Sequence, residues 1–206
     1  MAMDRPGKIV CVGRNYREHA KEMGNEVPAE PLLFLKPPSA IIASGAAIEL
    51  PPDAGRVDFE GEVGIVIGST LRRSSPEACA RGVRGIVAAN DVSARDWQKD
   101  DGQWARAKGS DTFLPLGDES GAPHDLAALT VVSRLNGVER QRASTGELAF
   151  PIPVLLSYIT RYITLEPGDL VLTGTPAGVA ALSPGDVVEV EVIGHSRVSS
   201  PVVAGA

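Results

Sequence analysis

The sequence predicts a β-rich α+β fold with many short strands and few short helices. Its 206 residues are 43% apolar, which is enough to build one substantial core. The 22 glycines and 16 prolines are spread along the chain, so regular elements should be short and separated by turns. Most apolar runs have the length of strands rather than helices. Because no repeat or linker interrupts the pattern, we expect one domain over residues 1–206.

The composition excludes several functional classes. The net charge is −6 and there is no long basic run, so neither nucleic acid nor an anionic membrane surface is an expected partner. No stretch approaches the roughly twenty apolar residues of a membrane span, and the first apolar segment is too short for a signal peptide. The two cysteines, Cys11 and Cys79, lack the spacing of a disulfide framework or a zinc site. We expect a cytoplasmic protein that acts on a small molecule.

The strands are predicted from short apolar runs between turn residues. The predicted ranges are 8–12, 32–36, 47–50, 59–68, 85–93, 130–135, 138–142, 169–174, 186–194 and 197–203. Asn136 and Gly137 separate two of these runs and predict a hairpin with a type I′ turn.

Three helices are predicted. The first covers residues 14–23, with Asn15 as N-cap and Glu18 three residues later. The second covers 152–163 and a weaker third covers 76–82. One side of the second helix carries the apolar residues expected to be buried, which are Leu155, Leu156, Ile159 and Ile163.

Three acids alternate along the predicted strand in VDFEGEVGIVIG. Asp58, Glu60 and Glu62 share one face, because successive side chains of a strand point to opposite sides. A polar strand face that is exposed to solvent explains the pattern. A hard divalent cation that neutralises neighbouring carboxylates is the competing explanation. Gly61 is expected where a side chain would crowd the opposing core.

Asp91 follows the apolar run from Ile86 to Ala89, where a buried strand emerges. A lone carboxylate at such a place is costly unless it is paired or binds a metal. Two interpretations stay open, a third metal ligand and a cap of the turn that begins at Ser93.

His19 and Glu22 lie three residues apart on the first predicted helix, so their side chains can touch. A carboxylate that orients a histidine makes a general base, and a short polar helix of this kind could act as a lid. An incidental pair on a surface helix is the alternative.

Three further residues are candidates for ligand contact. Arg95 is suited to clamp a carboxylate, with a salt bridge to Asp96 or to another surface acid as the alternative. Lys108 lies in a predicted loop, where it is either solvated or points into an anionic pocket. Thr175 lies in a compact turn after a strand, and this turn lacks the spacing and the lysine of a P-loop.

In their order, six segments resemble the fumarylacetoacetate hydrolase family, in particular its short acylpyruvase and oxaloacetate decarboxylase members. The segments are VGRNYREHAKEM, LFLKP, FEGEVGIVIG, NDVSARDWQ, KGSDTFLPLG and ITLEPGDLVLTGTPAGV. The resemblance implies a mixed β-roll with a lid segment over residues of about 14–30, and a homodimer.

The resemblance also implies roles for individual residues. Glu60, Glu62 and Asp91 match ligands of Mg²⁺ or Mn²⁺, whereas Asp58 matches no ligand and remains a surface or supporting residue. His19 and Glu22 match the catalytic dyad of the family. The positions that match the lining of the substrate pocket are Arg95, Gln98, Lys108 and Thr175. Arg14 of the GRNY segment matches the family without a defined role.

The implied activity is cleavage of the C3–C4 bond of a 2-oxo acid through a metal-held pyruvate enolate, as acylpyruvate hydrolysis, oxaloacetate decarboxylation or both. The dyad would activate water for hydrolysis, and Lys108 would help to stabilise the enolate. Tautomerisation or isomerisation of a related dicarbonyl acid is the alternative, together with dehydration of a sugar acid. A fold that binds metal and carboxylates without catalysis is a further alternative.

Overall fold

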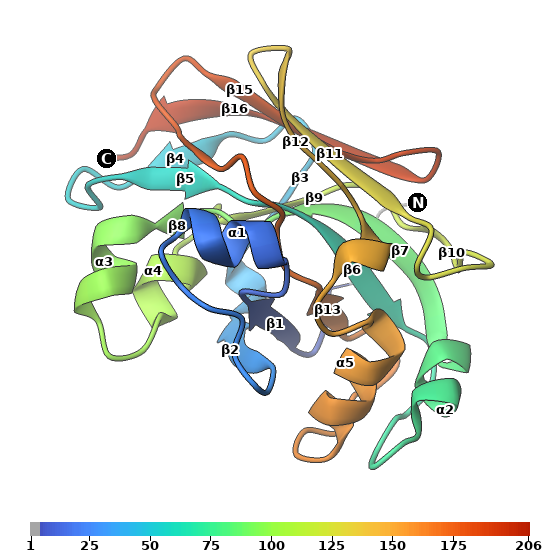
Figure 1. Cartoon of the computed structure of the whole chain (residues 1–206). Coiled ribbons are helices and arrows are strands. Elements are labelled where there is room, and N and C mark those ends of the chain that lie inside the picture. The colour runs from blue at the N-terminus through green and yellow to red at the C-terminus, as the bar shows by residue number, and fades with distance from the viewer. Residues whose placement is uncertain (1–4) are drawn as a thin grey trace.

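Two large sheets packed face to face form the frame of the protein (Figure 1). The computed structural model describes residues 5–206. The first sheet has the order β2-β1-β13-β6-β7-β9-β3, and β10 also pairs with β7. Its strands are β1 (Ile9–Gly13), β2 (Leu32–Lys36), β3 (Ile41–Ala43), β6 (Gly61–Ile67), β7 (Val83–Asn90), β9 (Leu114–Leu116), β10 (Ser120–Gly121) and β13 (Leu170–Leu172).

The second large sheet has the order β12-β11-β15-β16-β4, and a small third sheet has the order β14-β5-β8. The second sheet contains β4 (Ile48–Leu50), β11 (Thr130–Leu135), β12 (Val138–Ser144), β15 (Val187–Val192) and β16 (Ser196–Ala204). The third contains β5 (Val57–Phe59), β8 (Ser93–Ala94) and β14 (Ala180–Ala181).

Short helices surround the sheets. They are α1 (Arg17–Glu22), α2 (Pro76–Arg81), α3 (Arg95–Asp100), α4 (Ala105–Gly109) and α5 (Ile152–Thr160), with 3₁₀ turns η1 (Pro38–Ala40) and η2 (Thr145–Glu147). None of the helices described over residues 5–206 is long and apolar enough to cross a membrane. The predicted β-rich fold with few short helices is confirmed.

The first sheet buries both of its faces. One face packs against the second sheet, α2 and α5 through residues such as Ile65, which meets Val190 in the same core cluster. The other face carries a second cluster that includes Val66, Val87 and Leu170. Apart from Ala40, the buried members of this cluster come from strands of the first sheet itself, so the sheet must curl around them. The alternation of side chains along β6 and β7 therefore points one set of residues into the curl.

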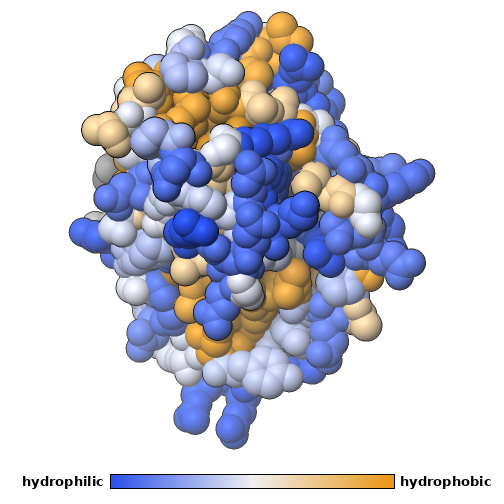
Figure 2. All heavy atoms as spheres, turned by 90° about the vertical axis from the view of Figure 1, so that its left-hand side faces the viewer, coloured by the Kyte–Doolittle hydropathy of each residue, from blue (hydrophilic) through white to orange (hydrophobic). Residues whose placement is uncertain are grey.

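Figure 2 shows the face that carries α3 and α4, which lie at the left of Figure 1. Hydrophilic side chains cover the middle of this face, and hydrophobic side chains are exposed above and below them. Leu35 on the edge strand β2 is the most exposed leucine among the exposed apolar residues, at 54%.

The strand that was predicted over residues 59–68 is two strands, β5 and β6, which are separated at Glu60. Its acids do not face solvent, because Asp58, Glu60 and Glu62 are all buried. The solvent-face interpretation is wrong because the polar face of an alternating strand points into the curl of the sheet. Period-two alternation identifies a face but cannot say what covers it.

The first helix begins at Arg17 rather than near Asn15, and its N-cap residue is Tyr16. Asn15 instead links distant segments of the chain. Its side-chain amide donates to the Thr173 carbonyl (2.8 Å), and its side-chain oxygen accepts from the Phe150 amide (2.8 Å). The predicted N-cap is therefore wrong. A buried asparagine that links distant segments has the same local sequence context as a cap.

The other predictions differ from the structure mainly at boundaries. Helix α2 is confirmed, and α5 ends at Thr160 rather than at residue 163, with Ile163 packed against the core beyond its end. Asn136 and Gly137 both have positive φ, as the type I′ turn requires. The short strands β3 and β9 and the helices α3 and α4 were not predicted. They are too short, and the two helices too polar, for hydrophobic periodicity to mark them.

Candidate active site

A cavity of about 440 Å³ lies between the curled sheet and the helices α1, α3 and α4. This volume is typical of small-molecule sites. The cavity is lined by Val12, Gly13, Arg14, His19, Met23, Asn25, Phe34, Glu60, Glu62, Asp91, Arg95, Asp96, Gln98, Lys99, Trp104, Lys108 and Thr175. It thus brings together every site residue predicted from the sequence except Glu22, which contacts the lining residue His19.

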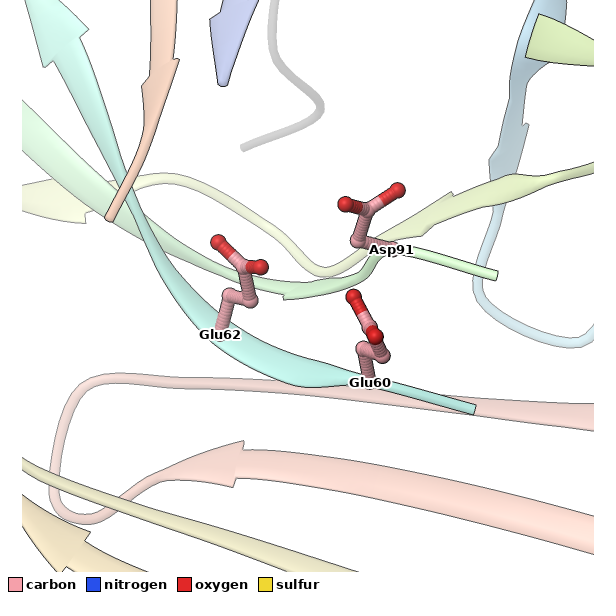
Figure 3. Close-up of side chains that lie close together, drawn as sticks. All are labelled: Glu60, Glu62 and Asp91. Atoms are coloured by element: carbon pink, nitrogen blue, oxygen red, sulfur yellow. The ribbon is translucent and has the colours of Figure 1, made fainter. Parts of the chain in front are cut away.

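Three buried carboxylates meet at the base of this cavity (Figure 3). Glu62 lies on β6, and Glu60 is the last residue before this strand begins. Asp91 is the first residue after β7 ends. The antiparallel pairing of the two strands places Asp91 beside Glu60, and the Asp91 amide donates to the Glu60 carbonyl at 2.8 Å. One oxygen from each carboxylate lies within 4.8 Å of the others.

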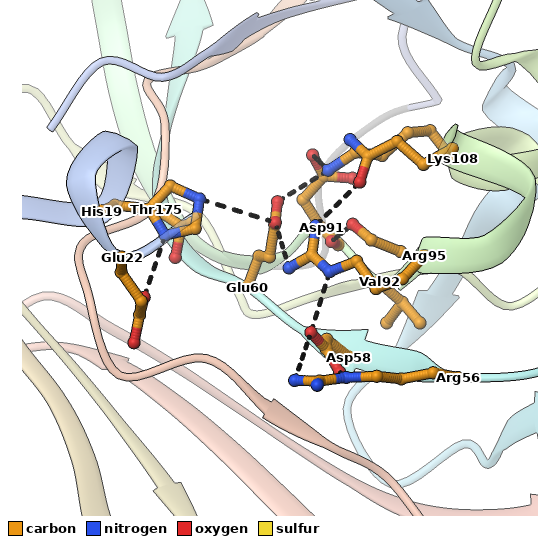
Figure 4. A network of polar contacts seen from close by, with 12 residues as sticks. His19, Glu22, Arg56, Asp58, Glu60, Asp91, Val92, Arg95, Lys108 and Thr175 are labelled. Atoms are coloured by element: carbon orange, nitrogen blue, oxygen red, sulfur yellow. Dashed lines mark hydrogen bonds and ion pairs between the residues drawn. The ribbon is translucent and has the colours of Figure 1, made fainter. Parts of the chain in front are cut away.

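Cationic side chains surround two of these three acids (Figure 4). The Lys108 ammonium donates to Glu60 (2.6 Å) and to Asp91 (2.8 Å). Lys36 donates to the second oxygen of Asp91 at 2.6 Å. Arg95 forms an ion pair with Glu60 at 2.7 Å. Lys108 lies on α4 and not in a loop, and its buried position excludes the solvated alternative.

The two glutamates differ in their pKa because their partners differ. Burial opposes ionisation of Glu60, but Lys108, Arg95 and His19 outweigh it and hold the pKa of this carboxyl well below its usual range. Burial raises the pKa of Glu62 well above its usual value, and the like charges of Asp91 and Glu60 add to the effect. Glu62 accepts a hydrogen bond from the Gly174 amide at 2.6 Å.

Asp58 supports the site from behind. It is fully buried, and it accepts from Arg95 Nε at 2.8 Å and from Arg56 Nε at 2.7 Å. Arg95 also donates to Gln98 at 2.9 Å. Arg95 thus connects Asp58 to Glu60, and the predicted alternative of a bridge to Asp96 is wrong, as is a surface position for Asp58.

Helix α1 brings His19 over the carboxylates. His19 Nδ1 lies 3.3 Å from Glu22, and Nε2 lies 3.9 Å from Glu60. A carboxylate only accepts hydrogen bonds, so Nδ1 is the nitrogen that donates toward Glu22, and Nε2 faces the cavity. Glu22 also accepts from the Gly178 amide at 3.0 Å, which ties α1 to the loop that follows β13. Movement of this helix as a lid stays a prediction.

The loop that carries Thr175 is fixed by a residue that was not predicted. Gln141 donates to the Thr175 hydroxyl (2.8 Å) and accepts from the Gly61 amide (3.0 Å). Thr175 in turn donates to the Gly61 carbonyl at 2.9 Å. A Cβ at Gly61 would overlap the hydroxyl of Ser133, so the expectation that a side chain would crowd this position is confirmed.

Lys36 is a further site residue that the sequence analysis did not single out. Its side chain is completely buried, yet its sequence neighbours are those of an ordinary edge strand. The one available signal was a lysine at the end of the apolar run LLFLK, where a charged residue marks either a strand end or a buried ion pair.

The three carboxylates fit a hard divalent cation. They supply only oxygen ligands, they are buried, and they converge from three backbone positions with one oxygen each. Glu60, Glu62 and Asp91 are thus the residues that would hold Mg²⁺ or Mn²⁺.

Comparison with known proteins agrees with this site. The sequence profile described as "Fumarylacetoacetate (FAA) hydrolase C-terminal" matches residues 8–203. The chain belongs to the fumarylacetoacetate hydrolase family. The resemblance that the sequence motifs predicted is therefore confirmed.

Relatives in this family differ in the reactions for which they are named. An oxaloacetate tautomerase of Escherichia coli is 39% identical over 205 residues, which cover 94% of this chain and 92% of that protein. A structure titled 5-carboxymethyl-2-hydroxymuconate delta-isomerase from Mycobacterium smegmatis is 42% identical, with a TM-score of 0.90 over 98% of this chain and 80% of that one. A fumarylpyruvate hydrolase of Pseudomonas aeruginosa, in complex with Mn²⁺ and pyruvate, is 30% identical, with a TM-score of 0.89 over 97% and 90%. Membership of the family is thus compatible with proton transfer and with bond cleavage.

Proposed function

We propose that the protein is a divalent-metal-dependent tautomerase or isomerase that interconverts the enol and keto forms of a 2-oxo acid. The observation that carries this proposal is the placement of two proton-carrying side chains around Glu60 (Figure 4). His19 Nε2 approaches Glu60 from one side at 3.9 Å, and Lys108 Nζ approaches it from the other at 2.6 Å.

Keto–enol exchange moves one proton between C3 and the 2-oxo oxygen. The Nε2 lone pair of His19 is placed to take the proton from C3 of the keto form, and Glu22 stabilises the imidazolium that results. Lys108 is held as an ammonium because Asp91 and Glu60 raise its pKa against the opposing effect of burial. It can therefore donate a hydrogen bond to the oxygen on which negative charge develops.

A bound Mg²⁺ or Mn²⁺ would add Lewis-acid stabilisation of that charge. Glu60, Glu62 and Asp91 would hold it, and the Mn²⁺ named with the Pseudomonas aeruginosa hydrolase supports this assignment. Arg95, Gln98 and Thr175 line the same cavity and are proposed to orient the substrate. The relatives named as a tautomerase and an isomerase are more similar to this chain than the relative named as a hydrolase, which supports proton transfer as the reaction.

Cleavage of the C3–C4 bond is the second candidate. The same dyad could direct water to the distal carbonyl of an acylpyruvate, and oxaloacetate could lose CO₂ without a nucleophile. The name of the fumarylpyruvate hydrolase and the pyruvate in its structure favour this candidate. Both reactions share an enolate, so residue identity alone does not separate them.

One set of assays tests both candidates. Protein treated with EDTA and reloaded with Mg²⁺ or Mn²⁺ is mixed with the enol form of oxaloacetate, and the loss of enol absorbance is compared with pyruvate release. Acetylpyruvate is followed in parallel. Metal-dependent exchange that is much faster than pyruvate release is the expected result. Pyruvate release as fast as exchange would favour cleavage, and no metal response in any assay would contradict both candidates.

We also propose that the protein acts as a homodimer, as the resemblance implied. Edge strand β2, with its exposed Leu35, is compatible with an association surface. Sedimentation velocity tests this, since a monomer at micromolar concentration would contradict it.

A further inference from the structure

Gln141 is a buried glutamine that joins the second sheet to the active site without lining the cavity. Its Oε1 accepts from the Gly61 amide (3.0 Å), and its Nε2 donates to the Pro176 carbonyl (2.7 Å) and to the Thr175 hydroxyl (2.8 Å). A backbone amide can only donate and a carbonyl can only accept, so the two backbone partners fix which way the side-chain amide points. Both polar atoms of this side chain therefore have partners at least 34 residues away in the chain.

The place of Gln141 in its strand does not by itself call for a glutamine. Strand β12 is an edge strand of the second sheet, and the two neighbours of Gln141 in the chain are the exposed Arg140 and Arg142. An apolar side chain would suffice if the buried face of the strand only needed packing, as at Ala143. Burial of an amide costs free energy unless its hydrogen bonds are made. The hydrogen bonds of Gln141 thus account for its residue type, and packing does not.

Two hydrogen bonds hold the backbone between Glu60 and Glu62. Gly61 lies between these acids, and its amide donates to Gln141. Its carbonyl accepts from the Thr175 hydroxyl at 2.9 Å. The Gly61 amide belongs to the planar peptide unit that begins at Glu60 Cα, and the Gly61 carbonyl belongs to the unit that ends at Glu62 Cα. One hydrogen bond on each unit therefore limits the movement of both glutamate Cα atoms.

Thr175 is itself oriented by Gln141. A hydroxyl has one proton, and Thr175 directs it to the Gly61 carbonyl, so the hydroxyl oxygen accepts from Gln141. Gln141, Thr175 and Gly61 thus form a closed ring of three buried hydrogen bonds. Loss of one member leaves buried polar groups of the other two without that partner.

The loop that this glutamine holds also contacts side chains of the site. The Gly174 amide donates to the Glu62 carboxylate at 2.6 Å, and the Gly178 amide donates to Glu22 of the dyad at 3.0 Å. A Cβ at Gly178 would overlap the carbonyl of Arg140, so the loop lies directly against β12. One buried side chain of the second sheet thus supports the backbone of the acids and the loop that contacts them.

We infer that Gln141 is a positioning residue of the metal site, which sets the relative position of Glu60 and Glu62 through Gly61 and Thr175. The inference rests on the proposed function, because it assumes that the two carboxylates hold a divalent cation. Gln141 does not line the cavity, so it acts through these neighbours and not on a bound molecule. Hydrogen bonds behind metal ligands commonly contribute roughly 10- to 100-fold to metal affinity.

Gln141→Met tests this inference, because it keeps the length of the side chain and removes its hydrogen bonds. Calorimetry without substrate should show Mn²⁺ binding roughly tenfold weaker than in the wild type, since Glu60 and Glu62 lose their fixed spacing. Thr175→Val removes the hydroxyl and should weaken binding by a similar factor, whereas Thr175→Ser retains the hydroxyl and should bind as the wild type does. The double variant Gln141→Met/Thr175→Val should bind about as weakly as the weaker single variant, because both changes act on Gly61.

Thr145→Val is the matched control for a general loss of stability. Thr145 is a buried threonine that directly follows β12 and does not line the cavity, and its hydroxyl donates to the Leu126 carbonyl at 2.8 Å. Thr145→Val and Gln141→Met should both lower the urea midpoint of the metal-free protein, but only Gln141→Met should weaken Mn²⁺ binding. Wild-type Mn²⁺ affinity in Gln141→Met, or an equal loss in Thr145→Val, would overturn the inference. If Gln141→Met does not fold, equal Mn²⁺ affinities of Thr175→Val and Thr175→Ser would overturn it.

The same titrations separate this inference from the proposed function. If the wild type binds Mn²⁺ and catalyses keto–enol exchange, but Gln141→Met binds Mn²⁺ equally well, only the inference fails. If the wild type binds Mn²⁺ without catalysing exchange, and binding weakens in Gln141→Met, the inference stands and the tautomerase function fails. A wild-type protein that does not bind Mn²⁺ would overturn both.

Discussion

The inner and outer ends of the cavity differ in how their charges are balanced. The inner end comprises the three carboxylates with Lys36, Lys108 and Arg95, and there the cations neutralise acids within the folded chain. Asp58 adds support behind Arg95. The outer end, which we define as the half-buried Arg14 and the exposed Lys99, also lines the cavity, and neither side chain has an ion-pair partner among residues 5–206. The difference predicts that loss of a cation at the inner end lowers the stability of the protein, whereas loss of one at the outer end does not.

The largest expected effect comes from breaking the inner end at Glu60. Glu60→Gln removes a proposed metal ligand and leaves Lys108 and Arg95 with an uncharged partner. Metal-dependent turnover should fall on the order of 10⁴-fold, equivalent to about 5.5 kcal/mol in the activation barrier. Mn²⁺ affinity, measured by calorimetry, should fall in parallel. Glu139→Gln on the exposed strand β12 is the control, and normal Mn²⁺ binding by Glu60→Gln would remove this residue from the metal site.

Replacing one lysine at the inner end and one at the outer end of the cavity tests this comparison, with the free energy of unfolding as the measured quantity. Lys36→Met takes the completely buried partner from Asp91 and should cost about 3 kcal/mol of unfolding free energy. Lys99→Met changes an exposed side chain and should leave the urea midpoint of the metal-free protein unchanged. If the two variants unfold at the same urea concentration, the distinction between the two ends is wrong.

His19 tests the catalytic part of the inner end without its metal ligands. His19→Gln should lower kcat roughly 100-fold, or about 2.7 kcal/mol, because the proposed base is lost. Mn²⁺ affinity should stay near that of the wild type, since the three carboxylates are intact. Stopped-flow exchange and calorimetry on one preparation provide both values. An unchanged kcat would exclude the dyad as the base.

The smallest expected effect concerns pH and Glu62. Burial and the charges of Asp91 and Glu60 raise the pKa of this carboxyl in the folded protein, so the folded state retains a proton that the unfolded chain releases. The resulting stability is fully present below the unfolded pKa of about 4.3 and is lost as pH rises through the raised pKa. Metal-free Glu62→Gln should therefore be more stable than the wild type at neutral pH, with a flatter pH dependence.

Chemical denaturation of the metal-free proteins across this pH range provides the measurement for Glu62. Glu191→Gln, which removes an acid from the solvent-facing side of β15, is the control. If the unfolding free energy of metal-free Glu62→Gln falls with rising pH as steeply as that of the wild type, Glu62 does not cause this loss of stability.

Local sequence patterns predicted the strands and the acids for specific reasons. Apolar runs and glycine or proline boundaries locate β6 and β7, and alternation places Glu60 and Glu62 on one side. The same patterns misassigned Asn15, because a buried amide and a helix cap look alike locally. They did not identify Lys36 or Gln141, whose partners lie 55 and 80 residues away in the chain.

The sequence by itself determined the β-rich fold, the family and the set of acids from which the site is built. These features depend on residue type and spacing, which the order of the chain records directly. Only the tertiary structure decided which acids receive a cation, because the curl of the first sheet brings α3, α4 and β2 around Glu60 and Asp91. It also decided that Arg14 and Lys99 line the cavity without an ion-pair partner among residues 5–206. Charge compensation depends on distances between segments that are far apart in the chain, and no local pattern encodes those distances.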